Sequence, residues 1–471
     1  MIATYNNLLF EKIEFNQGEL DSQIIKDLIK TFEPDRERMI GLWNKYKGVV
    51  PILEKTMPDS YKKNNKLAND FRGIIVTQVV GYLWGIPIVY TFDQSRYDEN
   101  QSQNIKLAIE EFNKTNNIEQ LDSITGEYAS VCGYGSRLFY IDINGILRTM
   151  NVAPWETIFV YDPTIDKMMY SIIYYQIDYY DLKTKTYSKR WKVELYDDTN
   201  VSFYFEYEKN KFELDPDEPK NPTPHMFNDV PVVKFNNNTL NTGDFESVQS
   251  LIDSYDLLTS NAQDELDEFR LAYLAIIGGQ ITDDDVKRAR QTGVFQNPEG
   301  VDIKFITKEL PTAMYDSQAK KLKENIFALS STLDFSDQVF SGNAESGLAR
   351  RLKFQSLESK SIIKERNYSK ALFDQYNLLT DIWEKKKIKL NPYDMQFIFG
   401  RDLPIDIMYY AQAGALLTGQ VSEETKLSLF PFIPDPSEEL KRLDNERNNS
   451  GPIIDLNILA DEPINEPTGS V

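Results

Sequence analysis

Apolar residues recur every three or four positions over the first part of the chain, which is the spacing of helices that bury one face. One such helix begins at Pro34, a favourable first-turn residue, and ends at Gly48, a favourable terminator. Residues 1–33 form a polar lead-in with a short helical pattern around 24–31. The helices predicted in this part cover residues 34–48, 65–84, 101–113 and 117–128.

Between residues 136 and 234 the apolar period shortens to two. Aromatic and β-branched residues alternate with polar ones, as in Trp191 to Tyr196, and turns rich in Asp and Asn separate these runs. The pattern predicts an antiparallel meander. Its many tyrosines would also suit a sugar or nucleotide platform, but aromatic residues are common on half-buried strands, which favours the structural interpretation.

A helical period near 3.5 residues begins abruptly at Gly243 and continues for about 30 residues. The other faces of this predicted helix are strongly acidic and include Asp253, Asp256 and Asp264. A helix of this length with a narrow apolar seam needs a partner helix or a neighbouring subunit. The seam contains Phe245, Val248, Ile252, Tyr255, Leu258, Leu266 and Phe269.

A small mixed module separates this helix from the next one. It contains a strand pattern at 272–277, a short helix at 283–291 and further strand patterns up to Ile306, and a helix over 312–332 follows it. Two helical struts therefore hold an α/β tip, and the fold class is α+β. The remaining predicted elements are a loop at 334–346, a very long helix at 347–387, a strand at 394–399, short helices at 404–418, 422–429 and 436–447, and a disordered acidic tail at 450–471.

The charge balance argues against one class of function. The chain has 52 Lys and Arg against 73 Asp and Glu, a net charge of −21, which disfavours a protein that grips nucleic acid by its overall charge. A protein that lets DNA pass without holding it is compatible with this charge.

Two scarce residue types exclude further classes. Cys132 is the single cysteine, so the chain cannot form an internal disulfide, as is typical of proteins of a reducing cytoplasm. His225 is the single histidine, so zinc sites built from several Cys and His ligands are excluded within one chain. Because His225 follows the proline-rich run 221–224, an ordinary loop histidine is favoured over a catalytic one.

Two stretches have some features of a membrane span or of a phosphate-binding loop. Residues 73–92 carry no charge, yet Gly85 and Pro87 break them into a helix and a strand, so we predict no membrane span. Residues 342–347 have the glycine spacing of a phosphate-binding loop, but the Lys-Ser/Thr pair that should follow is missing.

Acidic residues offer one local cluster, Asp283, Asp284 and Asp285. These carboxylates could bind a metal, but Thr282 and Asp285 have the spacing of a capping box, and acids suit a helix N-terminus. We therefore predict no metal site and no cofactor. Carboxylates elsewhere are plentiful enough for a two-acid hydrolase, although no pair of them is singled out by the sequence.

Basic residues gather on the first half of the helix predicted at 347–387. They form either a solvated or inter-subunit salt-bridge face, or a surface that touches a polyanion intermittently. The residues are Arg350, Arg351, Lys353, Lys360 and Lys364.

Several motifs follow one another in a fixed order between about residues 35 and 430. They are Asn65 to Phe71 with Gly81 to Ile88, Pro231 to Asn237, Gly243 to Glu246 with Leu251 to Asp256, and Ser346 to Ala349 with Leu357 and Glu358. In their order and spacing they resemble the portal proteins of long-tailed bacteriophages that infect Gram-positive hosts.

This resemblance implies a ring, usually of twelve copies, at one vertex of the phage capsid. Such a ring is the channel for packaging and ejection of double-stranded DNA. It docks the terminase motor and later a head-completion or adaptor protein, and it contacts the major capsid and scaffolding proteins. The chain would then be a non-enzymatic virion protein that is assembled in the host cytoplasm, with no membrane partner.

The resemblance also divides the chain into regions. We expect the acids of the first stem helix to face the channel or the outer solvent, where they would repel DNA phosphates. The regions are a wing at 1–242 with the strand 394–399 returning to it, stem helices at 243–271 and 312–332, a clip at 272–311, a tunnel loop at 333–346, a long wing or tunnel helix at 347–390, a crown at 403–449 and the acidic tail at 450–471.

Two of these regions carry the residues that the resemblance assigns to partners. The tunnel loop would project toward DNA, and the clip would dock the motor and the head-completion proteins. The tunnel-loop residues are Asp337, Gln338, Val339, Phe340, Ser341 and Asn343, and the clip residues are Asp283, Asp284, Asp285, Lys287, Arg288 and Arg290.

Two alternatives stay open at this point. One is a carboxylate-dependent hydrolase or nuclease, which would be a monomer or a small oligomer. The other is a different oligomeric virion protein, such as a tail or baseplate component. The small tip between two struts and the loop before the very long helix favour the portal.

Overall fold

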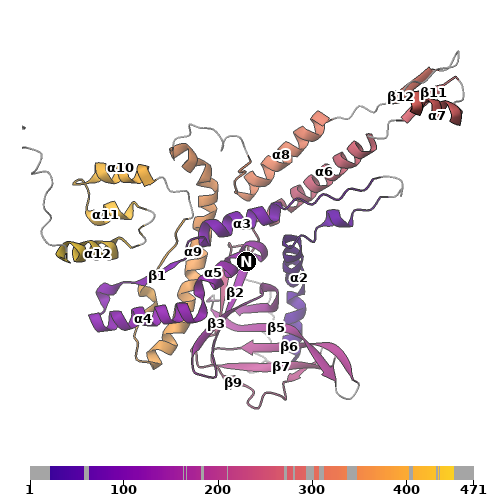
Figure 1. Cartoon of the computed structure of the whole chain (residues 1–471). Helices are drawn as coiled ribbons and strands as arrows, with labels where there is room; N and C mark the ends of the chain where they lie inside the picture. Colours follow the sequence, from indigo (N-terminus) through magenta and orange to yellow (C-terminus); the bar gives the residue numbers. More distant parts are fainter. Residues whose placement is uncertain are drawn as a thin grey trace, which may run out of the picture. The chain divides into compact units, whose positions relative to one another are not determined.

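The computed structural model of the chain divides into two compact units, one within residues 1–399 and one within 400–471. Figure 1 shows the elements of both. The structure describes residues 22–57, 63–162, 164–165, 167–181, 185–208, 211–269, 273–278, 282–292, 302–306, 312–336, 347–401, 407–430, 433 and 435–449.

The first described helix, α2 (Ser22–Tyr46), begins earlier than the sequence predicted. The predicted start, Pro34, lies inside the helix, where a proline removes one hydrogen bond and costs about 3 kcal/mol or more. The turns before it bury Ile25, Leu28 and Phe32, and burial of each such side chain contributes about 1.5–3 kcal/mol. The apolar face therefore outweighs the local cost of the proline.

Helix α3 (Phe71–Trp84) begins later than the predicted start at residue 65. Asp70 caps it by accepting a hydrogen bond from the backbone N–H of Gly73 at 2.9 Å. Residues 63–70 are not helical because they bind another helix, as described below. Strand β1 (Val89–Phe92) follows α3 after a break at Gly85, as the sequence predicted.

Helices α4 (Glu99–Asn116) and α5 (Ile118–Cys132) come next. Asn117, with a φ of 50°, separates them, and Gly133, with a φ of 102°, ends α5. A Cβ atom at Gly133 would lie 1.9 Å from the backbone oxygen of Asn241, so only glycine fits this close approach.

The predicted meander forms two antiparallel sheets. In the smaller one, β2 (Tyr134–Ile141) lies between β3 (Leu147–Val152) and β10 (Val232–Asn236). The larger sheet has the order β4-β5-β6-β7-β8, and β9 also pairs with β7. Its strands are β4 (Thr157–Tyr161), β5 (Met168–Asp181), β6 (Thr186–Tyr196), β7 (Asn200–Glu208), β8 (Lys211–Leu214) and β9 (Thr223–Pro224).

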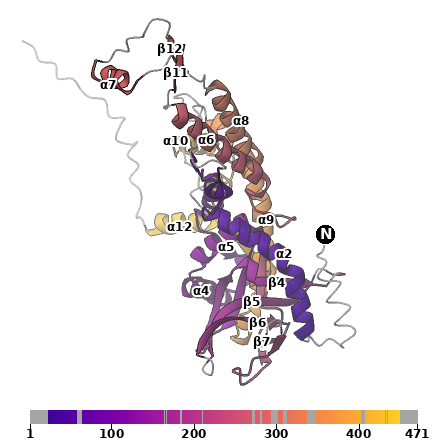
Figure 2. The same cartoon turned by 90° about the vertical axis from the view of Figure 1, so that its right-hand side faces the viewer.

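Helix α2 runs along one face of the larger sheet, as both Figure 1 and Figure 2 show. The ring of Phe32 meets the edge of Tyr174 on β5 at a centroid distance of 6.3 Å, and Arg36 lies over the ring of Trp191 at 5.1 Å. Tyr174 is fully buried, so at least part of the tyrosine content serves the core.

The region after the sheets has the predicted succession of long helix, small module and helix. Helix α6 (Gln249–Phe269) and helix α8 (Thr312–Ser330) contact one another and lie side by side in Figure 1. Between them in the chain come β11 (Tyr273–Ile277), α7 (Asp283–Thr292) and β12 (Asp302–Ile306), and β11 pairs with β12 in antiparallel register.

Helix α9 (Gly347–Lys385) is the longest described element. Its second half is buried along a seam that includes Leu372, Tyr376 and Leu379. Strand β13 (Met395–Ile398) then pairs with β1, with Val89 opposite Ile398.

Within its described residues, the second unit contains three helices, close to their predicted ranges. They are α10 (Ile407–Leu417), α11 (Glu423–Ser428) and α12 (Pro436–Asn449). Ser422 caps α11 by accepting a hydrogen bond from the backbone N–H of Thr425 at 3.2 Å. The predicted acidic tail, 450–471, lies outside the described residues.

Mixed helices and antiparallel sheets confirm the predicted α+β class. The larger unit has two apolar clusters, one between α2 and the larger sheet and one around the second half of α9. None of the helices in the described part of the chain is long and apolar enough to cross a membrane.

Candidate functional site

Residues 63–70 run in an extended conformation along one face of α6, and we call them the strap. Alternate backbone N–H groups of the strap donate to side chains one helical turn apart on α6. The spacing fits because two extended residues and four helical residues each cover about 6 Å. The bonds run from Asn65 to Asp264 (2.6 Å), from Leu67 to Ser260 (2.9 Å) and from Asn69 to Asp256 (2.9 Å).

Two cationic side chains, one before the strap and one after it, add ion pairs to this contact. The ammonium of Lys55 lies 2.7 Å from Asp264, and the guanidinium of Arg72 lies 2.5 Å from Asp253. Asp256 and Asp264 are only 1% and 4% exposed. The expectation that the acids of this helix face a channel or the outer solvent is therefore wrong for these two residues.

The two buried acids of α6 have opposite pKa shifts. Burial raises the pKa of Asp256. The donors from Asn69 are neutral and do not offset this effect, and Oδ2 has no hydrogen-bond partner among the described residues. At Asp264, burial acts in the same direction, but the hydrogen bonds from Lys55 and Asn65 outweigh it and lower the pKa. Asp264 thus has a lysine as a direct donor, whereas Arg72 acts on Asp256 only through its charge.

Burial along the predicted seam of α6 decreases from its beginning to its end. Phe245, Val248 and Ile252 are fully buried, whereas Leu266 is 45% exposed. Tyr255 and Leu258 between them are half-buried, and the side chain of Phe269 lies outside the described residues. The chain itself thus covers the first half of the seam and leaves Leu266 open.

The predicted docking residues of the small module belong to α7. Thr282 and Asp285 exchange hydrogen bonds, with the backbone N–H of Thr282 at 3.0 Å from the Asp285 carboxylate, which confirms the capping box. These bonds lower the pKa of Asp285. Asp283, Asp284, Lys287 and Arg288 are exposed, and the side chain of Arg290 lies outside the described residues.

Asp244, five residues before α6, is the centre of a buried polar cluster. Its carboxylate lies 2.6 Å from the ammonium of Lys364 and 3.1 Å from that of Lys360, both on α9. Ser130, near the end of α5, donates to it at 2.5 Å. Asp244 and Lys364 are 5% and 3% exposed, so this is a buried ion pair that joins α5, α6 and α9.

The pKa values in this cluster follow from burial and from the unequal number of charges. Burial raises the pKa of Asp244, but the charges of Lys364 and Lys360 outweigh it and hold the pKa well below its usual range. Lys364 has a single carboxylate beside it and a second lysine nearby. Burial therefore lowers the pKa of Lys364 to about 8.

The structure gives two of the predicted basic-face residues a different role. Lys364 is directed at Asp244, and Lys360 bridges Asp244 and the backbone oxygen of Ser330 at the end of α8, at 2.8 Å. The other predicted residues of that face, Arg350, Arg351 and Lys353, belong to α9, but their side chains lie outside the described residues, as do the tunnel-loop residues Asp337, Gln338, Val339, Phe340, Ser341 and Asn343.

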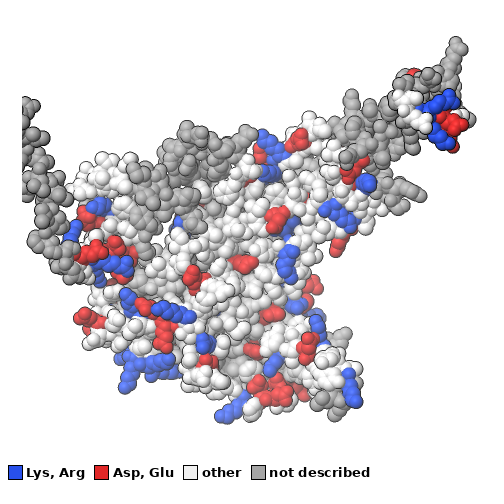
Figure 3. Space-filling model, viewed as in Figure 1, with Lys and Arg blue, Asp and Glu red and all other residues white. Residues whose placement is uncertain are grey.

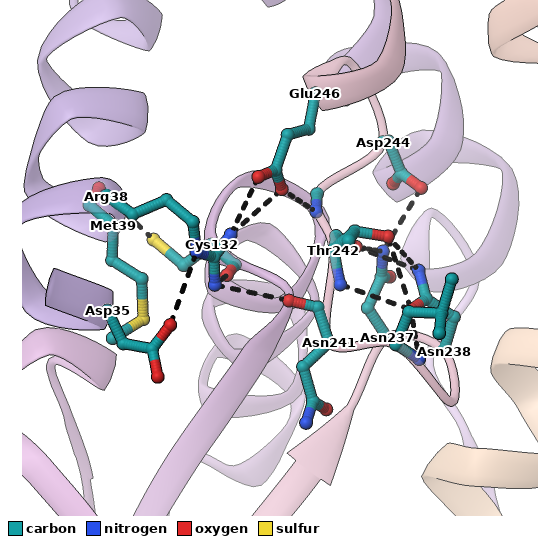
Figure 4. A network of polar contacts seen from close by, with 12 residues as sticks. Asp35, Arg38, Met39, Cys132, Asn237, Asn238, Asn241, Thr242, Asp244 and Glu246 are labelled. Carbon is teal, nitrogen blue, oxygen red and sulfur yellow. Dashed lines mark hydrogen bonds and ion pairs between the residues drawn. The ribbon is translucent and has the colours of Figure 1, made fainter. Parts of the chain in front are cut away.

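The loop from Asn237 to Glu246 connects the smaller sheet to α6, and Figure 4 shows how it is held. Arg38 on α2 donates to both carboxylate oxygens of Glu246, at 3.0 and 2.9 Å, and to the backbone oxygens of Cys132 and Asn241. One guanidinium thus ties α2 and α5 to the segment that begins α6.

A second buried cation fastens α9 to the smaller sheet. Arg137 on β2 is fully buried and donates to Asp122 on α5 at 2.9 Å and to Gln375 on α9 at 2.9 Å. Tyr368 on α9 donates to the same Asp122 at 3.0 Å. Burial is the largest influence on Tyr368, and with the charge of Asp122 it raises the pKa of Tyr368 well above its usual value.

Sequence reasoning missed the residues that hold α6 and α9. Asp244 and Lys55 have no local pattern that distinguishes them from other charged residues. One signal was available for Arg137, which stands in a run of apolar and small residues on a predicted strand.

Among the described residues, the single histidine and the single cysteine form hydrogen bonds to backbone groups. The Nε2 of His225 lies 3.0 Å from the backbone oxygen of Asp197, and its Nδ1 accepts from the N–H of Phe227. Burial lowers the pKa of His225 and raises that of the buried Cys132, which keeps the thiol protonated. In the described part of the chain, no group of three His, Cys, Asp or Glu side chains could hold a metal ion.

Comparisons with known proteins point to one family of phage proteins. Residues 25–452 match the family model described as "Phage portal protein, SPP1 Gp6-like". The chain is 24% identical over 426 residues to the portal protein of Bacillus phage SPP1, with 86% of this chain and 80% of that protein covered. It is 23% identical over 355 residues to the portal protein of Clostridium phage phiCD119, with 70% and 73% covered.

Proposed function

The chain belongs to the SPP1 Gp6-like family of phage portal proteins, and from this premise we propose how its parts serve a portal. It functions as a phage portal, a virion component, in a family whose members are structural proteins that form an oligomeric ring in the phage capsid. We propose that the ring has twelve copies, lies at one vertex of the capsid and forms the channel for packaging and ejection of double-stranded DNA.

We assign the parts of the ring as follows. The stem is residues 243–271 and 312–332, which include α6 and α8, and the clip is residues 272–311. The tunnel loop is residues 333–346, of which 337–346 approach DNA, and the crown is residues 403–449. The clip docks the terminase motor and later the head-completion protein, through the exposed charges of α7. Capsid and scaffolding proteins meet the wing, residues 1–242 with β13.

One observation carries the ring proposal. Helix α6 has an apolar seam whose first half is buried within the chain, while Leu266 near its end is 45% exposed. A neighbouring stem would cover this end. The strap occupies a different face of α6 and binds it at Asp264 and Asp256.

Leu266→Asp tests this proposal directly. We expect the wild-type chain to form a particle of about 655 kDa, twelve times the chain mass of 54.6 kDa, and the variant to stay folded but to lose this particle. Native mass spectrometry and circular dichroism measure the two properties. Replacing an exposed leucine on a wing helix, Leu107→Asp on α4, is the matched control and should leave the ring intact.

A full-sized ring of Leu266→Asp would contradict the proposed stem contact. Loss of the ring in both variants would show that the effect is not specific to α6, which also contradicts it. A wild-type chain that stays monomeric in the presence of scaffolding and capsid proteins would overturn the ring itself.

A further inference from the structure

Helix α3 presents one stripe of side chains to three different elements. Phe71, Ile75, Gln78 and Tyr82 are spaced by four, three and four residues, so they share a face. At one end, the ring of Phe71 meets Tyr255 of α6 and Phe327 of α8, at centroid distances of 5.0 and 5.8 Å. The first residue of the stripe therefore packs against both stem helices.

Gln78, in the middle of the stripe, binds the chain just after α8 at two points. Its Nε2 donates to the backbone oxygen of Leu333 at 2.7 Å, and its Oε1 accepts from the backbone N–H of the same residue at 2.9 Å. Leu333 is 6% exposed, so these are well-shielded bonds. A side-chain amide thus satisfies both backbone groups of one residue, as a neighbouring strand would do.

Other contacts fix the same stretch of chain. Helix α8 ends at Ser330, and the next residue, Ser331, has a φ of 57° that turns the chain out of the helix. The ammonium of Lys360 binds the backbone oxygen of Ser330 at 2.8 Å, and Asp334 pairs with Lys323 at 2.9 Å. The path from Ser330 to Ser336 is therefore determined before residues 337–346 begin.

Tyr82, at the far end of the stripe, holds the chain on the other side of that segment. Its hydroxyl donates to Glu358 on α9 at 2.6 Å, and its ring stacks on Phe354 at a centroid distance of 6.3 Å. One helix, α3, thus contacts both stretches of chain that flank residues 337–346.

We propose that Gln78 and Tyr82 are positioning residues that set the distance between the two flanks of residues 337–346. They hold the Leu333 flank and the Glu358 flank against one rigid helix, which also rests on the stem through Phe71. This inference rests on the proposed role of residues 337–346 at the DNA. It adds that the spacing of the two described flanks is set by α3, which itself need not touch DNA.

The first experiment measures the flank itself. In the assembled ring, Gln78→Leu should speed hydrogen exchange at the amide of Leu333 by roughly ten- to a hundredfold, because two hydrogen bonds are lost. Gln78→Glu keeps an acceptor for that N–H and should give a smaller increase. Gln103→Leu, at an exposed glutamine on α4, is the matched control and should leave this amide unchanged.

The second experiment measures DNase-protected DNA per capsid assembled with each variant ring. We expect a loss of packaged DNA with Gln78→Leu, while ring mass stays that of the wild type. Tyr82→Phe keeps the aromatic stacking and removes only the bond to Glu358. It carries the test at the second flank, and it replaces Gln78→Leu if that variant forms no ring.

A variant of the segment itself, Phe340→Asp, separates the two levels of the proposal. Normal packaging with Phe340→Asp would overturn the proposed DNA-facing role of residues 337–346. A packaging defect with Phe340→Asp, together with normal packaging in Gln78→Leu and Tyr82→Phe, would overturn the positioning role alone. Unchanged exchange at Leu333 in Gln78→Leu would also overturn it.

Discussion

Helices α6 and α9 are two long charged helices of the larger unit, and their charged side chains are bound in different ways. The buried acids of α6 accept hydrogen bonds mainly from neutral groups of the strap, while Lys55 binds Asp264 and Arg72 binds Asp253. Lys360 and Lys364 of α9 are paired with one buried carboxylate, Asp244. In both helices, charges that the sequence placed on open faces join elements within the chain.

The two helices should respond differently when one partner of a charged interaction is removed. Removing one member of the Asp244 cluster leaves an uncompensated charge in a dry interior. Removing an acid of α6 leaves backbone N–H groups at the edge of the strap, where water reaches more easily. The first loss should therefore be larger, and the predictions below are ordered in that way.

The largest expected effect is at the buried ion pair. Asp244→Asn and Lys364→Met should each lower the free energy of unfolding by about 3–5 kcal/mol, because each leaves a buried charge with fewer partners. The double variant should lower the free energy of unfolding by much less than the sum of the two single variants. Urea unfolding followed by near-ultraviolet circular dichroism measures these values.

Lys321→Met, at an exposed lysine on α8, is the control for this comparison and should stay within about 0.5 kcal/mol of the wild type. If the two single costs were simply additive in the double variant, Asp244 and Lys364 would not act as a pair. The contrast between α9 and α6 would then lose its basis.

A smaller effect is expected within α6, where the two buried acids should differ from each other. Asp264→Asn loses the charge that binds Lys55 and should cost about 1.5–3 kcal/mol, the range of hydrogen bonds to charged groups. Asp256→Asn keeps an amide oxygen for the donors of Asn69 and removes a charge that burial disfavours, so its cost should be close to zero. Proteolysis of the strap, together with urea unfolding, checks both variants.

Equal costs at the two positions would show that Lys55 does not distinguish them. A larger cost for Asp256→Asn than for Asp264→Asn would reverse the assignment, because it would mean that the charge of Asp256 is the one that holds the strap.

The smallest effect is a pH dependence that has opposite signs at these two acids. The folded pKa of Asp264 is lowered, so its contribution is present above the unfolded pKa of about 4 and is lost as the pH falls toward the folded value. The folded pKa of Asp256 is raised, so the folded state takes up its proton first, and acid relieves the cost of the buried charge.

We therefore expect the stability difference between the wild type and Asp264→Asn to shrink from pH 7 to pH 3. The difference between the wild type and Asp256→Asn should move in favour of the wild type over the same range. Thermal unfolding of the three proteins at both pH values measures this, and parallel shifts of the two variants would contradict it.

Much of the architecture could be predicted from the sequence, because periodicity is a local property of the backbone. The period of two between residues 136 and 234 and the period near 3.5 after Gly243 located the sheets and α6. The errors arose where tertiary contacts override local preferences. Pro34 is tolerated inside α2 because its neighbours are buried, and α3 begins late because the strap is bound to α6.

The candidate site was predicted less well than the fold. The seam of α6 and the capping box of α7 follow from spacing alone, and the structure contains both. The roles of Lys360 and Lys364 could not be predicted, because their partner Asp244 lies more than a hundred residues away in the chain. Gln78 and Tyr82 had one local signal, since they are polar groups on the apolar stripe of a helix whose one charged residue is Arg72.

The sequence by itself determined the class of the fold, the order of its elements and, through its motifs, the family. Only the tertiary structure decided which charged side chains pair within the chain and which stay exposed to partners. The physical reason is that a helix face is set by the 3.6-residue period, whereas the partner of a buried charge depends on which distant segments meet there. Asp264 and Asn65 are 199 positions apart, and no local pattern connects them.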